Sequence, residues 1–382
     1  MRRAHCVKIA LVGPVVAGVL AGGCGNPEVR IGAPRGETPT LATTGETPVN
    51  GSPTTQWGPI RLFGEPPEGS GIHFEGRAAS GLQQHTFTRE GADFDPDIDR
   101  TGRLLVFAST CHSPRPNIYA KAVGEAAITQ LTDDPASEVQ PRICPDGKWV
   151  AYTSDRSGNW DIWITSIDGQ TTQQVTKSPA AEIHPDWSPD GHRLVYCALN
   201  PQNQQWELWV VDLRQPGTKK FIGSGLFPRW APTQDVIVYQ RARSRGNRWF
   251  SIWTVQLIDG EPRFPTEVAS SAEYALIAPT WSADGTKIIY CSVEPAAPHG
   301  GSWKTRSARA DLWITDLDGR GKTCLTHGDA VNYSPVCASD GRVYFTSNRS
   351  GFENIWSLVP IRAPAPVADA RPVGVAPTAS GN

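Results

Sequence analysis

Acidic side chains alternate along one short stretch of the chain, at Asp93, Asp95, Asp97 and Asp99. A strand would place all four on one side of its backbone, where carboxylates can ligate a calcium ion. The spacing of an EF-hand loop is absent, because Ile98 stands at the position of its glycine and Leu104 at that of its bidentate glutamate. The aspartates therefore do not form an EF-hand calcium site, and we expect them to have other partners.

Oppositely charged residues recur at one position of a repeated motif, directly after a proline, where the chain has Asp97, Arg142, Asp186 and Arg229. If the repeats form a ring, this order places Asp97 beside Arg142 and Asp186 beside Arg229. We favour such ion pairs near the axis over a metal site, and His184 precedes one of the prolines. The predicted cluster at the channel mouth consists of Asp95, Asp97, Arg142, His184, Asp186 and Arg229.

Aromatic and basic side chains form a second candidate set, in the hairpins between the second and third strands of the repeats. Aromatic rings with interspersed arginines are typical of surfaces that bind proteins or glycans. The alternative is that the rings pack against neighbouring hairpins and the charges are only solvated. The set comprises Trp160, Trp206, Arg241, Arg243, Arg245, Arg248, Trp249, Trp303, Lys304, Arg306 and Phe352.

No catalytic pattern stands out beside these two sets. The chain has no evident pair of nucleophile and base, no phosphate-binding loop and no metal-ligand spacing. A lone histidine such as His184 is more often structural than catalytic. We therefore predict a protein that is not an enzyme and that uses no cofactor or metal.

The motif that positions these residues occurs six times. Its clearest copy is Pro-Asp-Trp-Ser-Pro-Asp-Gly from Pro185, and the others start at Pro96, Pro141, Pro228, Pro279 and Pro335. The successive steps of 45, 44, 43, 51 and 56 residues are close to the period of propeller blades. Each copy predicts four short strands, named A to D from the axis outward, with Asp-Gly turns between them. The fold class is therefore all-β, a six-bladed β-propeller with four-stranded blades.

The last copy ends after its third strand, near Pro360, and lacks a strand D. The segment Gln84-His85-Thr86-Phe87-Thr88, ahead of the first copy, is similar to the ends of strand D in other copies. We predict that residues 82–90, an N-terminal strand, supply the outer strand of the last blade and close the ring, which removes an unpaired edge.

The repeated residues resemble a known family. Pro-x-Trp-Ser-Pro-Asp-Gly, the run from Tyr152 to Asn159, and Asp161-Ile162-Trp163 are similar to the WD40-like repeat of TolB-type propellers. TolB is a periplasmic protein that acts with a peptidoglycan-associated lipoprotein and carries an α/β domain ahead of its propeller. The resemblance implies an envelope protein, although a short tether replaces the α/β domain here. Related propellers adjoin hydrolase domains, but this chain has no Gly-x-Ser-x-Gly elbow.

The N-terminus reads as an export signal. Arg2, Arg3 and Lys8 precede a short apolar segment, and the sequence Leu-Ala-Gly-Gly before Cys24 resembles a lipobox whose leucine is displaced by one position. An ordinary signal peptide is the alternative to lipidation at Cys24. The predicted organisation is a signal peptide over 1–24, a Pro/Thr/Gly-rich tether over 25–81, the propeller over 82–362 and a tail over 363–382.

Six cysteines follow Cys24, and only Cys111 and Cys144 lie in adjacent blades at positions compatible with a disulfide, so free thiols are the default. A formal net charge of −2 favours no nucleic acid partner. We expect an exported, membrane-anchored propeller on the periplasmic face of the cell envelope that binds an envelope protein, peptidoglycan or another glycan. Two alternatives are a polysaccharide lyase or hydrolase with a site at the channel mouth, and a purely structural module of an envelope complex.

Overall fold

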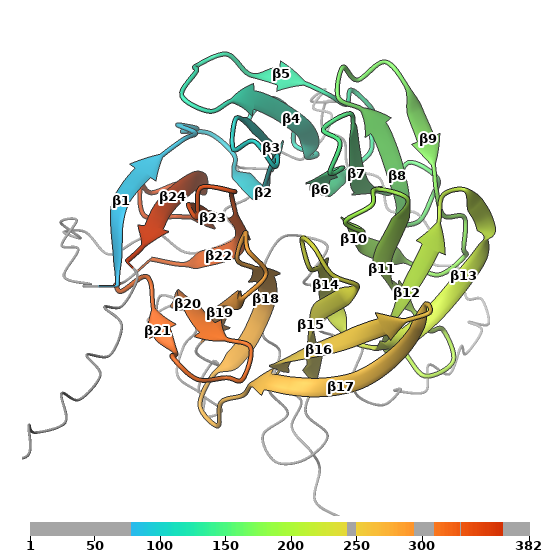
Figure 1. Cartoon of the computed structure of the whole chain (residues 1–382). Coiled ribbons are helices and arrows are strands. Elements are labelled where there is room, and N and C mark those ends of the chain that lie inside the picture. Colours follow the sequence, from blue (N-terminus) through green and yellow to red (C-terminus); the bar gives the residue numbers. More distant parts are fainter. Residues whose placement is uncertain (1–77, 243–249, 294–308, 329, 362–382) are drawn as a thin grey trace, which may run out of the picture.

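The computed structural model describes residues 78–242, 250–293, 309–328 and 330–361, which form a ring of six four-stranded antiparallel sheets (Figure 1). This arrangement confirms the predicted all-β, six-bladed propeller. The described part of the chain contains no helix that could cross a membrane. The signal segment, Cys24, the tether up to residue 77 and the tail lie outside the described residues.

Each blade contributes one strand to each of four concentric positions. Strands A, nearest the axis, are β2 (Asp93–Ile98), β6 (Glu138–Ile143), β10 (Glu182–Trp187), β14 (Leu226–Trp230), β18 (Ala275–Trp281) and β22 (Asn332–Cys337). Strands B are β3 (Leu104–Ser109), β7 (Trp149–Ser154), β11 (Arg193–Leu199), β15 (Val236–Ala242), β19 (Lys287–Val293) and β23 (Val343–Ser347). Strands C are β4 (Asn117–Ala122), β8 (Asp161–Ser166), β12 (Trp206–Asp212), β16 (Phe250–Ile258), β20 (Ala310–Asp316) and β24 (Asn354–Pro360). Strands D are β5 (Thr129–Gln130), β9 (Thr172–Gln174), β13 (Gln215–Ser224), β17 (Glu261–Ala269), β21 (Thr323–Cys324) and β1 (Ala79–Gln84).

Strands B are buried on both faces because each blade packs between two others. Val150, Ala151 and Tyr152 in β7 are all inaccessible to solvent. Apolar and aromatic residues suit this position, since burial of each Val or Leu side chain contributes about 1.5–3 kcal/mol. The turns from strand A to strand B need a positive φ, which Gly147 (73°) and Gly191 (70°) supply.

The tryptophan of the Pro-x-Trp motif joins neighbouring blades. Trp187 is 6% exposed, and its indole Nε1–H donates to the carbonyl of Arg142 in the preceding blade at 3.0 Å. Trp281 makes the same 3.0 Å bond to the carbonyl of Arg229. A buried indole with a satisfied N–H contributes both packing and a directional contact. The motif therefore recurs because it serves the interface between blades.

The ring closes between the two ends of the propeller chain. Strand β1 pairs antiparallel with β24, with Ala79 opposite Pro360 and Gln84 opposite Trp356. The predicted closing segment, 82–90, overlaps this strand only over 82–84, and the strand starts at Ala79. The amide of Ile361 also donates to the carbonyl of Ala78 at 2.7 Å, so both ends of the described propeller lie together.

All six cysteines of the described residues are free, including Cys111 and Cys144. The one disulfide that the sequence left open is therefore not formed in this structure. Cys197 and Cys291 are fully buried, which raises the pKa of both thiols above its ordinary value.

Candidate functional site

A repeated backbone irregularity shapes the inner wall of the propeller. In every blade the register between strands A and B shifts at the residue before the motif proline, and that residue has a positive φ. Bulges of this kind change the direction of a side chain. The six residues are Asp95 (51°), Gln140 (57°), His184 (55°), Phe227 (51°), Ala278 (47°) and Ser334 (49°).

Side chains of this layer bind one another across blade boundaries. The Ser334 hydroxyl donates to Asp95 Oδ1 at 2.8 Å. Gln140 Oε1 accepts both the backbone N–H of His184 and the Thr153 hydroxyl at 2.9 Å. Because that oxygen accepts twice, the amide nitrogen of Gln140 donates to His184 Nε2, at 2.7 Å. The proton of the His184 imidazole is therefore on Nδ1.

His184 stays neutral in this environment. Burial is the main cause that lowers the pKa of its imidazole well below 6.5, and the nearby Arg142 guanidinium lowers it further. The ring packs on Phe227 with centroids 3.8 Å apart. Within the described residues Nδ1 has no hydrogen-bond partner. These contacts favour the structural role that we predicted for this histidine.

The next layer toward the A–B turns is an ion-pair cluster centred on Arg229. Its Nη2 lies 3.3 Å from Asp97 Oδ1, and its Nε lies 3.8 Å from Asp186 Oδ1. The second oxygen of each aspartate accepts a backbone N–H from the following blade, of Ile143 at 2.7 Å and of Trp230 at 2.6 Å. Both carboxylates are thus fully engaged.

The predicted pair of Asp97 with Arg142 is wrong for the described residues. Asp97 belongs to the first blade and Arg229 to the fourth, on the opposite side of the ring, so their ion pair crosses the axis. The arginine side chain is long enough to cross the axis of the ring. The order of the repeats in the sequence indicates only which blades are adjacent, so it could not predict this contact. Arg142 instead donates from Nη1 to the carbonyl of Pro141 at 2.7 Å. Burial, followed by repulsion from Arg229, lowers the pKa of Arg142 to about 10.

The four alternating aspartates do not act as one ligand set. Asp93 accepts the Ser109 hydroxyl at 2.6 Å, and Asp99 accepts the backbone N–H of Leu104 at 2.9 Å in the first A–B turn. Asp95 and Asp97 have the separate partners described above. In the part of the chain that the structure describes, no group of three or more metal-ligating side chains is assembled.

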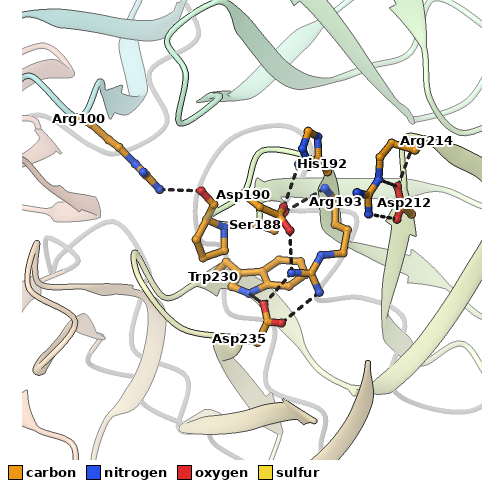
Figure 2. A network of polar contacts seen from close by, with 10 residues as sticks. Arg100, Ser188, Asp190, His192, Arg193, Asp212, Arg214, Trp230 and Asp235 are labelled. Atoms are coloured by element: carbon orange, nitrogen blue, oxygen red, sulfur yellow. Dashed lines mark hydrogen bonds and ion pairs between the residues drawn. The ribbon is translucent and has the colours of Figure 1, made fainter. Parts of the chain in front are cut away.

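The A–B turn end of the channel is bridged by an arginine. Arg100, which is labelled in Figure 2, lies in the A–B turn of the first blade. It donates from Nη2 to the carbonyls of Pro189 at 3.2 Å and Pro232 at 3.4 Å. These two prolines belong to turns of the third and fourth blades. Together with the Asp97–Arg229 pair, this contact places two bridges across the axis. The channel is therefore not a straight open pore.

A second contact in Figure 2 joins the third and fourth blades on the same face. Arg193 donates to both oxygens of Asp235, at 2.8 and 3.3 Å, and its guanidinium lies 4.8 Å from the Trp230 ring (Figure 2). Trp230 Nε1 also donates to Asp235, at 3.2 Å. Such bidentate, stacked arginines give a fixed geometry. This face of the propeller is thus tied together by its own side chains.

The B–C hairpin set is described only in part. Trp160 and Trp206 are half-buried and pack against the main core, and their carbonyls accept amides of the next blade, from Glu182 at 2.7 Å and Gly225 at 3.0 Å. Both rings thus belong in part to the hydrophobic core, and their role in binding stays a prediction. Arg241 is exposed, 5.1 Å from the Trp253 ring, and Phe352 is half-buried. The rest of the predicted set lies outside the described residues: Arg243, Arg245, Arg248, Trp249, Trp303, Lys304 and Arg306.

Two exposed aromatic side chains on the same face were not predicted. Phe87 is 70% exposed and Tyr274 is 40% exposed. Both lie in connections from a strand D to the next strand A, which reach the same face as the B–C hairpins. The sequence held no signal for this position of Phe87, because residues 82–90 are predicted to form a strand, whereas β1 ends at Gln84. An exposed aromatic with a loop backbone is a common element of binding surfaces.

Comparison with known proteins gives a consistent picture of the fold. The pattern that defines the TolB beta propeller domain matches residues 77–264. An uncharacterized protein of Agrobacterium fabrum is 30% identical over 109 residues, which are 28% of this chain and 31% of that protein. The chain thus matches about a third of the length of this relative.

Solved structures are similar at lower identity. A protein provisionally named TolB from Agrobacterium tumefaciens has a TM-score of 0.53 at 19% identity, over 71% of this chain and 91% of its own. TolB from Acinetobacter baumannii has a TM-score of 0.49 at 17% identity, over 69% and 64%. An oligogalacturonate lyase from Vibrio parahaemolyticus has a TM-score of 0.49 at 14% identity, over 73% and 93%. At 19% identity, the likeness to the Agrobacterium tumefaciens structure shows a shared fold.

Proposed function

Since the chain is a TolB-like six-bladed β-propeller, we propose that it is an exported, lipid-anchored scaffold of the cell envelope. It would bind a protein or a cell-wall glycan through the face that carries the B–C hairpins and the D–A connections, named here the hairpin face. The basic, apolar segment that ends at Cys24 supports export and anchoring.

One observation carries the choice of face, namely that the hairpin face exposes Phe87 and Tyr274. Large exposed aromatics are enriched at interfaces, where they bury much area at little cost in side-chain entropy. Arg241 is exposed on the same face. On the opposite face, Arg100 and Arg193 are engaged in contacts between the blades.

The path of the chain is compatible with a partner that binds at the hairpin face. Ala79 begins β1 at the end where β24 finishes, which is the side of the A–B turns and C–D hairpins. A tether from Cys24 would therefore join the propeller at the face opposite to the hairpin face. The hairpin face would be left accessible to a partner.

The central cluster supports binding rather than catalysis. A lyase or hydrolase would need four side chains to converge in an accessible site, namely Asp95, Asp97, His184 and Asp186. Asp97 is held by Arg229 and the amide of Ile143. Asp186 is instead held by Arg229 and the amide of Trp230, and Asp95 by Ser334. Burial raises the pKa of Asp95 and Asp186 and lowers that of His184. We assign this cluster to holding the inner strands together.

Replacing Phe87 and Tyr274 together by alanine tests the proposed face. We expect binding of the purified full chain to isolated peptidoglycan or to envelope proteins, measured by co-sedimentation and pull-down, to fall by about tenfold or more, because central aromatics contribute roughly 1–2 kcal/mol each. The melting temperature should stay near that of the wild type, since both side chains are exposed.

The matched control is Leu317→Ala, which removes a 43% exposed apolar side chain from a C–D hairpin on the opposite face. This variant should bind like the wild type. Equal binding by the double variant and the wild type would rule out the hairpin face as the contact surface, and a loss confined to Leu317→Ala would assign binding to the other face.

A further inference from the structure

His85 occupies the contact that closes the ring, named here the closure seam and defined as residues 79–88 against β24. Its side chain is 4% exposed, and its Nε2 lies 2.7 Å from the Ser357 hydroxyl. Its backbone N–H donates to the carbonyl of Ile355 at 2.8 Å, and its ring packs on Tyr344 with centroids 4.8 Å apart. The imidazole is thus a buried part of the seam.

Two cations face His85 from different elements. Lys121 of β4 donates from Nζ to the backbone carbonyl of His85 at 2.7 Å. Arg342, which precedes β23, donates from Nη1 to the Ser357 hydroxyl and to the carbonyl of Gly81, both at 3.1 Å. Because the Ser357 oxygen accepts from Arg342, its own proton is available for donation to His85 Nε2. This arrangement suits a neutral imidazole.

The carboxylates near the seam are turned toward other groups. Asp93 accepts from Ser109 at 2.6 Å, interacts with the side chain of Thr86 in the seam, and acts electrostatically on Lys121. Asp99 and Asp340 act electrostatically on Tyr344. In the described residues, therefore, no carboxylate contacts the imidazole to balance a charge on it. Burial is the largest cause that lowers the pKa of His85 from 6.5 to about 4, followed by Arg342 and Lys121.

The closing strand is held by a limited set of contacts. The register of β1 against β24 is interrupted between Ser80 and Gln83. Beyond the strand, Asn354 Oδ1 accepts the Thr86 hydroxyl at 3.1 Å and the amide of Thr88 at 2.8 Å. An edge segment of this kind can open without unfolding the blades behind it.

We propose that the closure seam is a proton-sensitive device, in which protonation of His85 releases residues 79–88 from β24 while the other five blades stay folded. A proton on His85 would add a third positive charge beside Lys121 and Arg342 in a buried site. In the open state the imidazole is solvated and binds a proton readily, so opening takes up a proton.

The direction of the pH dependence follows from this difference. The pKa of His85 is lower in the closed state than in the open state, so the stability of the seam is complete above about pH 6.5 and is lost as the pH falls toward 4. For a change from 6.5 to about 4, the equilibrium constant for opening rises about 30-fold at pH 5 and roughly 300-fold at most.

Hydrogen exchange of the full chain tests the proposal directly. Exchange of the peptide covering residues 79–90, corrected for the intrinsic effect of pH, should be about 30-fold faster at pH 5 than at pH 7.5. In His85→Gln, which keeps a polar group near Ser357 but cannot be protonated, this acceleration should disappear. His192→Gln, at an exposed position, is the matched control and should behave like the wild type.

A second measurement keeps the test decisive if His85→Gln does not fold. The wild-type imidazole of His85, followed by NMR between pH 7.5 and pH 4, should titrate near 4 in the closed state. Titration of His85 near 6.5, or equal corrected exchange of residues 79–90 at both pH values, would overturn the proposal. Acceleration that persists unchanged in His85→Gln would also overturn it, because another group would then control the seam.

Discussion

A chain that lacks residues 79–88 should lose the cooperative unfolding of the propeller or melt at least about 10 °C lower than the wild type. The deletion removes β1, the buried His85 and the contacts of Thr86 and Thr88, and it leaves β24 as an exposed edge. Loss of several kcal/mol in a domain of this size corresponds to a change of about 2–4 °C for each kcal/mol. Thermal unfolding followed by circular dichroism measures the effect.

A deletion of equal length from the tail, residues 373–382, is the control for chain length. It should leave the melting temperature within about 1 °C of the wild type. If the deletion of 79–88 melted at the wild-type temperature, the pairing of β1 with β24 would contribute nothing to closure and the seam would have to be abandoned.

Replacement of Arg229 by methionine should reduce the free energy of unfolding by about 3–5 kcal/mol at pH 7. The guanidinium contacts Asp97 and Asp186, and both carboxylates are buried. Without Arg229 they would be two like charges with little solvation, so their folded-state pKa values would rise above those of the unfolded chain. Urea unfolding of the two proteins measures the difference.

The sign of the pH dependence gives this prediction a second readout. Because the folded state of Arg229→Met would bind protons more readily than the unfolded state, the deficit should shrink as the pH falls from 7 toward 5. Arg214→Met is the control, since Arg214 is 61% exposed and pairs with Asp212 at 2.7 Å on the surface. That variant should show no measurable loss. A wild-type stability of Arg229→Met at pH 7 would show that the cross-axis pair is not required.

The sequence predicts the architecture well because each blade repeats the same motif and therefore the same local structure. The positions of Pro, Trp and Asp-Gly in the motif determine strand A and its turn, and the apolar strand B follows at a constant distance. The burial of Trp187 and Trp281 against carbonyls of the preceding blades explains why the motif is kept in both copies. The same motif residues thus suit both the local structure of strand A and its turn and the packing between blades.

The central cluster could be predicted in composition but not in its connections. The repeat identified the charged residues after the motif prolines, and it placed Asp186 beside Arg229. It could not identify Arg229 as the partner of Asp97, because opposite blades are far apart in the sequence and only side-chain length brings them together. The positive φ of Asp95, Gln140 and Phe227 has no common side-chain chemistry from which it could be inferred.

The hairpin face shows a second reason why sequence patterns do not predict a surface. Trp160, directly before one strand C, and Trp206, at the start of another, break the register of the repeat, yet they are half-buried because they pack against the main hydrophobic core. Phe87 stands in a segment that is similar to the ends of strand D, and yet it is 70% exposed, because β1 ends at Gln84 and Phe87 lies in a D–A connection. Burial of this kind is decided by tertiary packing.

Site-specific photo-crosslinking tests the central claim, that the hairpin face contacts a partner, most directly. A photoreactive phenylalanine analogue would replace Phe87 or Tyr274 on this face, and Leu317 on the opposite face, in the full chain expressed in the envelope. We expect a discrete crosslinked product, to a protein or to peptidoglycan, from positions 87 and 274 and none from position 317. A product from position 317 alone, with none from positions 87 and 274, would contradict it.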